Sequence, residues 1–237
     1  MNKHKQLVAI FCLSVFMVGC GHDDDDDNMT TTPPPPPAKS TYSYEVTIHN
    51  LTNNQPLSPF SVVSHAGGTM IWQLGEAASE GIEHSAESGD NTNLLDSVIS
   101  YDANSGAGVI MPGMSDVLML KADDDSQYLS IISMLVNTND AFTGLVNYDL
   151  TEMTLGQVHT MSLPVYDAGT EANSELAATI PGPAGSGEGF NAMRDDRDFV
   201  TRHAGVVSMD DGLMGSALDQ SHRFESVVAV VTIERVE

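Results

Sequence analysis

Two segments constrain the fold of this chain more than any others. Residues 42–52, YSYEVTIHNLT, alternate between apolar and polar side chains and are rich in β-branched and aromatic residues. Residues 226–235, SVVAVVTIER, are almost wholly apolar. Alternation is typical of a strand with one buried face, and a short apolar run is typical of a strand inside a sheet. The first segment is therefore predicted to be a strand, and the second a central strand.

The residues between these two segments are predicted to form two short helical regions, a long loop region and further strands. Residues 72–90 carry alanines and glutamates with few β-branched residues, so they are expected to be helical in part, and residues 91–100 to form a short helix capped by Asn91 or Thr92. Residues 168–219 are rich in Gly and Pro and read as a long loop region. The fold class predicted for residues 42–237 is mainly β, a β-sandwich with short helical excursions and long Gly/Pro-rich loops. Further strands are expected at 60–67, 116–122, 127–136 and 157–165.

The first 20 residues, MNKHKQLVAIFCLSVFMVGC, have the pattern of an export signal. Two lysines precede a short apolar stretch, and a small residue precedes Cys20. The apolar stretch is shorter than the roughly 20 residues that span a bilayer. The ending MVGC resembles a bacterial lipobox, which implies cleavage of residues 1–19 and a lipid on Cys20. The alternative is a plain secretory signal with an incidental cysteine.

Residues 20–41 lack the apolar side chains needed for a core. They contain five consecutive aspartates, three threonines and five consecutive prolines, a composition typical of an extended, disordered tether. The aspartate run could bind calcium weakly, but a solvated charge run is the simpler interpretation. We expect this tether to hold a domain away from a membrane. Because Gly21 follows the cysteine, that membrane is expected to be the outer one, with the periplasmic or surface face left open.

Charge and cysteine content exclude several classes of function. The formal net charge is −24, so the chain is expected to repel nucleic acid and anionic membrane surfaces. The two cysteines, Cys12 and Cys20, lie in the signal and at the lipidation site. The predicted domain therefore has no thiol for a disulfide, a zinc site or a nucleophile, and must be stabilised by its core or by a bound ion.

Motifs for catalysis and for a contiguous calcium loop do not fit the sequence. There is no His-Glu-x-x-His pair, no phosphate-binding Gly-rich loop, and no serine at a nucleophile elbow. The segment that begins at Asp102 opens like an EF-hand but has Gly113 at its twelfth position. No catalytic residue is assigned, and any calcium site would have to be assembled from separate loops.

Two acidic turns could assemble such a site. Asp140 is expected to end one strand, in NTND, and Asp167 another, in VYDAGTE. Loops at one rim of a sandwich can meet, and two carboxylates there would repel each other unless a cation lay between them; Asn139, Thr170 and Glu171 could complete its oxygen shell. The alternative is that both segments are ordinary polar turns, in which aspartate accepts hydrogen bonds from backbone amides.

Four segments, taken in order, resemble the spondin N-terminal domain that is found in F-spondin, mindin and bacterial exported proteins. They are Trp72 with AASEG at 77–81, AESG at 86–89, the Ser133–Leu145 segment, and DAGTE at 167–171. The resemblance runs from about residue 44 to 236. It implies an antiparallel β-sandwich with a calcium ion at one end, held in part by Asp140 and Asp167. It also favours the ligand interpretation of Asp140 over the plain turn.

The resemblance implies a function without chemistry of its own. The expected role is a lipid-anchored, calcium-stabilised binding or adhesion module that is not an enzyme. Its expected partners are calcium, the membrane through Cys20, and an unidentified protein or glycan at the cell surface. Two alternatives stay open: an envelope enzyme or glycan-processing accessory that uses residues 182–200, and a purely structural lipoprotein.

Overall fold

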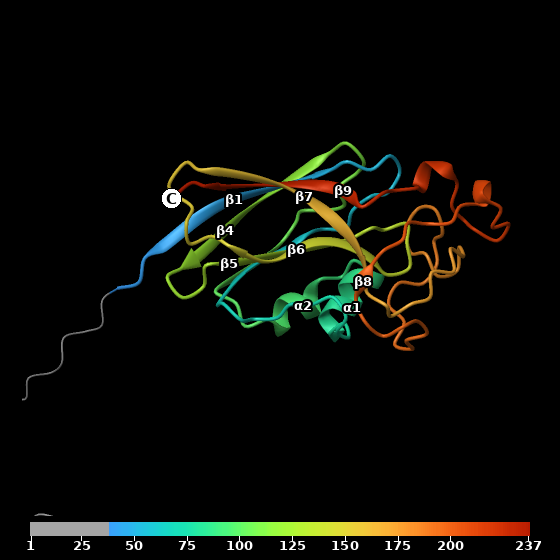
Figure 1. Cartoon of the computed structure of the whole chain (residues 1–237), viewed down its shortest axis with the longest axis horizontal. Coiled ribbons are helices and arrows are strands. Elements are labelled where there is room, and N and C mark those ends of the chain that lie inside the picture. The colour runs from blue at the N-terminus through green and yellow to red at the C-terminus, as the bar shows by residue number, and fades with distance from the viewer. Residues whose placement is uncertain (1–37) are drawn as a thin grey trace, which may run out of the picture. The chain divides into compact units, whose positions relative to one another are not determined.

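The computed structural model describes residues 38–237 (Figure 1). The predicted signal peptide, the lipidation site Cys20 and most of the predicted tether lie outside the described residues. The strands are β1 (Thr41–Asn50), β2 (Ser61–His65), β3 (Asp102–Ser105), β4 (Ser115–Asp123), β5 (Tyr128–Met134), β6 (Ala141–Asp149), β7 (Val158–Asp167), β8 (Thr201–Arg202) and β9 (Val227–Arg235). The helices are α1 (Glu80–Glu87) and α2 (Thr92–Ser97), with short 3-10 turns η1 (Met209–Asp211) and η2 (Gln220–His222).

The strands of the described region form one antiparallel ladder that folds over into two layers. Its order is β3-β2-β5-β6-β7-β9-β1-β4, with β8 paired to β7. The strand β7 belongs to both layers, because its first part pairs with β9 and its last three residues pair with β6. The two outer strands approach each other, since Lys121 N of β4 donates to Asp102 Oδ2 of β3 at 2.7 Å. The sheet is therefore nearly closed, and the prediction of a mainly β, antiparallel fold is confirmed.

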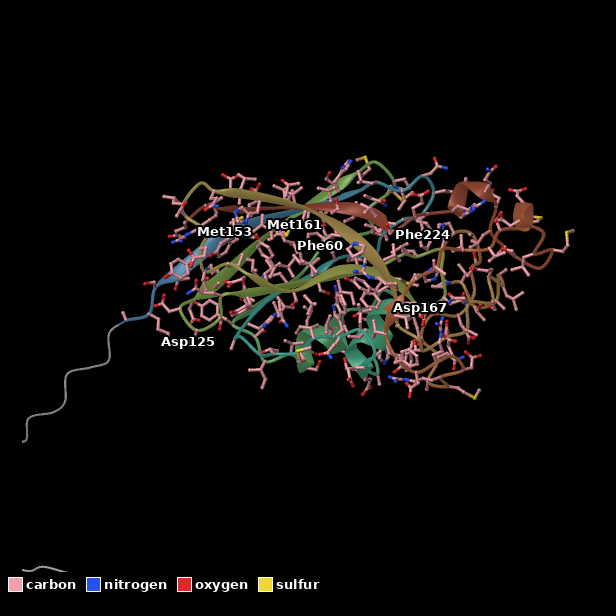
Figure 2. The ribbon with its side chains drawn as sticks, in the orientation of Figure 1. Phe60, Asp125, Met153, Met161, Asp167 and Phe224 are labelled. Atoms are coloured by element: carbon pink, nitrogen blue, oxygen red, sulfur yellow. The ribbon has the colours of Figure 1, made fainter. Side chains whose placement is uncertain are left out.

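The main core lies between the two layers. Tyr44, Val46 and Ile48 alternate along β1 and are fully buried, while the residues between them face outward. This period of two is what a strand with one solvated face requires. The side chain of Phe60 lies between the layers (Figure 2). The nearly continuous apolar strand β9 lies between β7 and β1, so its prediction as a central strand is confirmed.

A second core lies between the helices and the β5–β6 part of the sheet. In α1, Ile82 and Ala86 are four residues apart and face this core together. The helix is capped by Ser79, whose hydroxyl accepts from Ile82 N. Gly81 permits close packing on α2, because a Cβ there would lie 2.8 Å from Leu94 Cα. The helices cover the outer face of this layer, which explains why β2 and β5 are buried on both faces.

Several sequence-based boundaries were wrong. The strands β3, β6 and β8 were not predicted, whereas α1 lies within the segment expected to be partly helical and confirms that expectation. The strand β5 ends at Met134, so Asp140 does not end a strand; it directly precedes the first residue of β6. The prediction that Asp167 ends a strand is confirmed.

The long loops gather at one end of the two layers. Figure 1 shows the segments after β7 at the end where β5 gives way to β6, beside α1. The residue Asp167 lies at this end, while Asp125, in the β4–β5 turn, lies at the other (Figure 2). Neither helix among residues 38–237 is long and apolar enough to cross a membrane.

Candidate metal centre

The turn between β5 and β6 is built by its own polar side chains. The hydroxyl of Thr138 donates to Leu135 O at 2.6 Å and accepts from Ala141 N at 3.1 Å, which closes the turn. The amide of Asn137 donates to Asn54 O and accepts from Ala184 N, so it ties two loops to the turn. These residues have clear structural roles, which leaves the next two, Asn139 and Asp140, as candidates for binding.

Strand pairing brings the two predicted aspartates together. In the β6–β7 register, Ala141 stands opposite Asp167, and Ala168 N donates to Asp140 O at 3.3 Å. The negative charge of Asp167 contributes to raising the pKa of the Asp140 carboxyl. The two residues therefore meet at one end of the sandwich, as the sequence predicted.

Only one oxygen of the Asp140 carboxylate is satisfied by the protein. Its Oδ2 accepts from Thr170 N at 2.8 Å, Glu171 N at 3.1 Å and the Thr170 hydroxyl at 3.3 Å. Its Oδ1 is buried and has no hydrogen-bond partner among the described residues. A buried carboxylate oxygen without a partner is costly, so this atom needs either a proton or a cation.

The carboxylate of Asp167 is held differently. Its Oδ1 accepts from Gly169 N at 2.8 Å, and its Oδ2 accepts from Asn173 Nδ2 at 2.7 Å. Arg197 adds an ion pair at 3.9 Å. This carboxylate is therefore already satisfied by donors, although each oxygen keeps a second lone pair.

Two glutamates, like Asp140, are buried and have carboxylate oxygens without a hydrogen-bond partner. Both carboxylate oxygens of Glu171 and Oε1 of Glu87 are buried without a partner in residues 38–237. Glu87 lies at the end of α1 and Glu171 in the turn after β7, yet the charge of Glu87 contributes to raising the pKa of Glu171. Burial raises the pKa of Glu87, and the hydroxyl of Thr170, which donates to Asp140, partly opposes that rise. The three carboxylates thus lie around Thr170.

The crowding of negative charge changes the titration of these groups. Burial, and then the charge of Asp167, raise the pKa of Asp140 to about 7. Burial, and then the charges of Glu87 and Asp140, raise the pKa of Glu171 to about 8. Burial also raises the pKa of Glu87. Each shift means that the protein surroundings disfavour the ionised form unless a positive charge is supplied.

The arginines nearby serve other carboxylates. Arg194 pairs with Glu83 and Asp198, while Arg197 pairs with Asp167 and Asp196. None of these four ion pairs involves Asp140, Glu87 or Glu171, the three residues that we call the carboxylate cluster.

Neutral oxygens adjoin the carboxylate cluster as well. Asn139 donates through Nδ2 to the Thr179 hydroxyl at 2.5 Å, and its Oδ1 is buried without a partner within the described part of the chain. Thr170 is fully buried between Asp140 and Glu87. The sequence-based candidates Asn139, Thr170 and Glu171 therefore all lie at the same end of the sandwich as Asp140.

The glutamate Glu87 was missed as a site residue. It belongs to the AESG segment that carries part of the family resemblance, but a glutamate on a helix is usually exposed. Only the packing of α1 on the sheet shows that its side chain is fully buried. A carboxylate near the C-terminus of a helix also faces the negative end of the helix dipole, which is unfavourable without a compensating charge.

The carboxylate cluster suits a hard cation in chemistry, although it is not a preformed cage. Its donors are all oxygens, which calcium prefers over the nitrogen and sulfur ligands of zinc. Residues 38–237 contain no group of three His, Cys, Asp or Glu side chains already arranged to hold a metal ion. Binding would therefore require the side chains to move together, as a cation that removes their mutual repulsion allows.

Comparison with known protein families gives a match over the first two thirds of the domain. A family model described as Spondin_N matches residues 49–181, more than half of the chain. This span contains all three residues of the carboxylate cluster and Asp167, and it ends before most of the Gly-rich loop region. No curated protein matches the chain.

Proposed function

Because the chain belongs to the spondin N-terminal family, an extracellular type of domain, we propose that it is an exported binding module stabilised by calcium. The observation that supports this proposal most directly is the carboxylate cluster. Three buried acids with unpartnered oxygens lie at one end of the sandwich, and none of the arginine ion pairs at this end within residues 38–237 involves them.

Calcium would supply the missing charge. The residues that would hold it are Asp140, through its free Oδ1, and Glu171, with Asn139 and Thr170 as neutral oxygen donors. Asp167 keeps lone pairs for the ion and stays a proposed ligand. Calcium accepts 6–8 oxygens in flexible geometry, so side-chain and backbone oxygens from two turns suffice. The ion would join the β5–β6 turn to the turn after β7.

The proposed role is attachment and not catalysis. We propose that a lipid on Cys20 anchors the chain to the outer membrane of a cell envelope. The domain would then present a surface to a protein or glycan partner. The support is the signal and tether composition at residues 1–41. The long loops at the end with the carboxylate cluster, farthest from the start of β1, are the part of the domain best placed to reach such a partner.

A calcium titration tests the proposal. Isothermal titration calorimetry of the wild type should show one binding event, and Asp140→Asn should abolish it, because the variant loses the charged oxygen without losing shape. Asp124→Asn, in the exposed turn at the opposite end, is the matched control and should bind as the wild type does. If the wild type shows no heat of binding at millimolar calcium, the proposal is wrong.

A further inference from the structure

A loop segment outside the span of the family match closes over the carboxylate cluster. Residues 188–198, which we call the strap, run across α1 and back to the turn that holds Thr170. Asp195 N donates to Thr170 O at 3.1 Å, and Ala172 N donates to Asp195 Oδ1 at 2.8 Å. One side of the strap is thus fixed to the same turn that supplies Glu171.

The other side of the strap is fixed to α1 through three contacts. Phe190 stacks on His84 with ring centroids 3.6 Å apart. Arg194 binds Glu83 through two hydrogen bonds, Nε to Oε1 at 3.0 Å and Nη2 to Oε2 at 2.6 Å. Between these anchors, Asn191 N donates to Oε2 of Glu87 at 2.8 Å. The middle contact is the one that touches the carboxylate cluster.

The two oxygens of Glu87 therefore face different partners. Oε2 holds the strap, while Oε1 is buried without a partner in the described residues, and the Glu87 carboxylate acts electrostatically on Glu171. Glu87 is fully buried, so its charge cannot be relieved by solvent. A cation bound at Asp140 and Glu171 would meet this free oxygen, and a charged Glu87 would in turn be a strong acceptor for Asn191.

We propose that Glu87 is a third carboxylate ligand of the same cation, so that calcium binding keeps the strap closed over α1. The inference rests on the proposed calcium site and extends it in two ways. It adds a helix to the two turns that hold the ion, and it makes the position of a loop segment depend on the ion. Without the ion, Glu87 and Glu171 repel each other, and the contact from Glu87 to Asn191 weakens.

Trypsin can report directly on the strap. Arg194 and Arg197 lie within it, and Lys39 lies at the opposite end of the domain with more than half of its side chain exposed. In the full-length protein, we expect cleavage after Arg197, measured by mass spectrometry against cleavage after Lys39, to be about tenfold faster in chelator than in millimolar calcium. Equal rates in a wild type that binds calcium would overturn the proposal.

The variant Glu87→Gln separates the inference from the proposed function. It should weaken calcium binding by about tenfold or more in the same calorimetric titration, as loss of a metal-site group does, and should leave the strap susceptible in calcium. The matched control is Glu45→Gln, on the outer face of β1, which should change neither readout. If Glu87→Gln binds calcium and protects the strap as the wild type does, the inference fails while the loss in Asp140→Asn still supports the site. If the wild type binds no calcium, both fail.

A second variant covers the case in which Glu87→Gln does not fold. Asn191→Pro removes the backbone N–H that bonds Glu87 and leaves all three carboxylates in place. It should lose the calcium-dependent protection at Arg197 while it still binds calcium. Protection that persists in Asn191→Pro would show that the strap is held by its other anchors, and would overturn the proposed dependence on the ion.

Discussion

The two ends of the sandwich both carry aspartates in a turn between strands, yet the turns treat them in opposite ways. At the β4–β5 end, Asp124 is exposed, and its carboxylate accepts from Tyr42 OH at 2.6 Å and Ser40 N at 2.9 Å. These donors lower the pKa of Asp124. At the β5–β6 end, Asp140 is fully buried, has one free oxygen, and has its pKa raised to about 7.

The difference shows that the titration of an acidic turn follows from burial and partners, and not from its composition. Asp123, Asp124 and Asp125 form the denser acidic run, but Lys39 pairs with two of them and solvent reaches the third. Asp140 has fewer acidic neighbours in sequence, but the fold adds Glu87 and Glu171 from distant segments. An acidic run in the sequence is thus a weaker indication of a cation site than a buried acid with a free oxygen.

The largest expected effect is the response to calcium. An ion bound only by the folded state stabilises it by about 2.7 kcal/mol at a hundredfold excess over Kd. For a domain of this size, that raises Tm by roughly 5–10 °C. Differential scanning calorimetry of the wild type in calcium and in chelator should show this difference, and Asp140→Asn should remove most of it.

Asp124→Asn is the matched control for that measurement, because it changes the same residue type at the other end. Its calcium-dependent rise in Tm should equal that of the wild type. In chelator, Asp140→Asn should be as stable as the wild type or more stable, since the substitution relieves repulsion in the cluster. A wild type whose Tm is the same in both buffers would remove the distinction between the two ends.

The pH dependence of the calcium-free protein should have opposite signs at the two ends. The raised pKa values of Asp140 and Glu171 mean that the folded state holds protons that the unfolded state releases. Their contribution to stability is complete near pH 4 and is lost as pH rises through about 7 to 8. We expect the free energy of unfolding in chelator to fall by about 4 kcal/mol between pH 6 and 9, at about 1.4 kcal/mol for each pH unit over which one group stays protonated only in the folded state.

The lowered pKa of Asp124 works in the other direction. Its contribution to the free energy of unfolding is present above its ordinary pKa and is lost as pH falls through its lower folded value.

Because the alkaline loss of stability comes from the carboxylate cluster, Glu171→Gln should flatten that loss and leave the acid side unchanged. Urea denaturation at a series of pH values measures the loss of stability on both the acid and the alkaline side. If stability falls with pH as steeply in Glu171→Gln as in the wild type, Glu171 does not cause the alkaline loss.

Asp167 allows a finer test, because the protein already satisfies its carboxylate. If it is a ligand, Asp167→Asn should lower Tm in calcium and remove the calcium-dependent shift. The double variant with Asp140→Asn should then lose no further calcium dependence, because one site is lost only once. If Asp167 serves only to hold Gly169 and Asn173, the single variant should lose the same stability in calcium and in chelator.

The smallest effect is expected at the exposed end. Tyr42→Phe removes the hydroxyl that donates to Asp124, an exposed contact that solvent largely replaces. Thermal denaturation should show a small decrease in Tm that is equal in calcium and in chelator. A decrease seen only in calcium would mean that the exposed aspartates, and not the carboxylate cluster, respond to the ion.

The strands that were predicted correctly are those whose pattern is local. In β1 the alternation of buried and outward residues is visible in the sequence. In β9 the run of apolar residues is equally visible. The strand β6 was missed because its sequence, AFTGLVNYD, is interrupted by a glycine. That glycine is required by the neighbouring strand, since a Cβ on Gly144 would lie 2.2 Å from Ile131 O, beside the irregular register of β5.

The candidate site was predictable in part for a similar reason. Asp140 and Asp167 lie in turns, where a carboxylate among polar residues stands out in the sequence. Glu87 lies in a short helix with Glu80 and Glu83, and nothing local shows which of the three is fully buried and unpaired. Sequence reasoning could place the two turns at one rim, but the third carboxylate depends on how α1 packs on the sheet.

The position of β1 also determines how the domain bears a mechanical load. Its register pairs nine residues with β4 and seven with β9. The strand begins at Thr41, which pairs with Asp123 beside the β4–β5 turn, and Asp125 of that turn lies at the end opposite Asp167 (Figure 2). A pull on the chain before Thr41, opposed by a partner held at the far end, acts along the strand axis. Antiparallel hydrogen bonds lie perpendicular to that axis. The load would therefore shear both ladders at once instead of opening them pair by pair, a geometry that favours resistance to force.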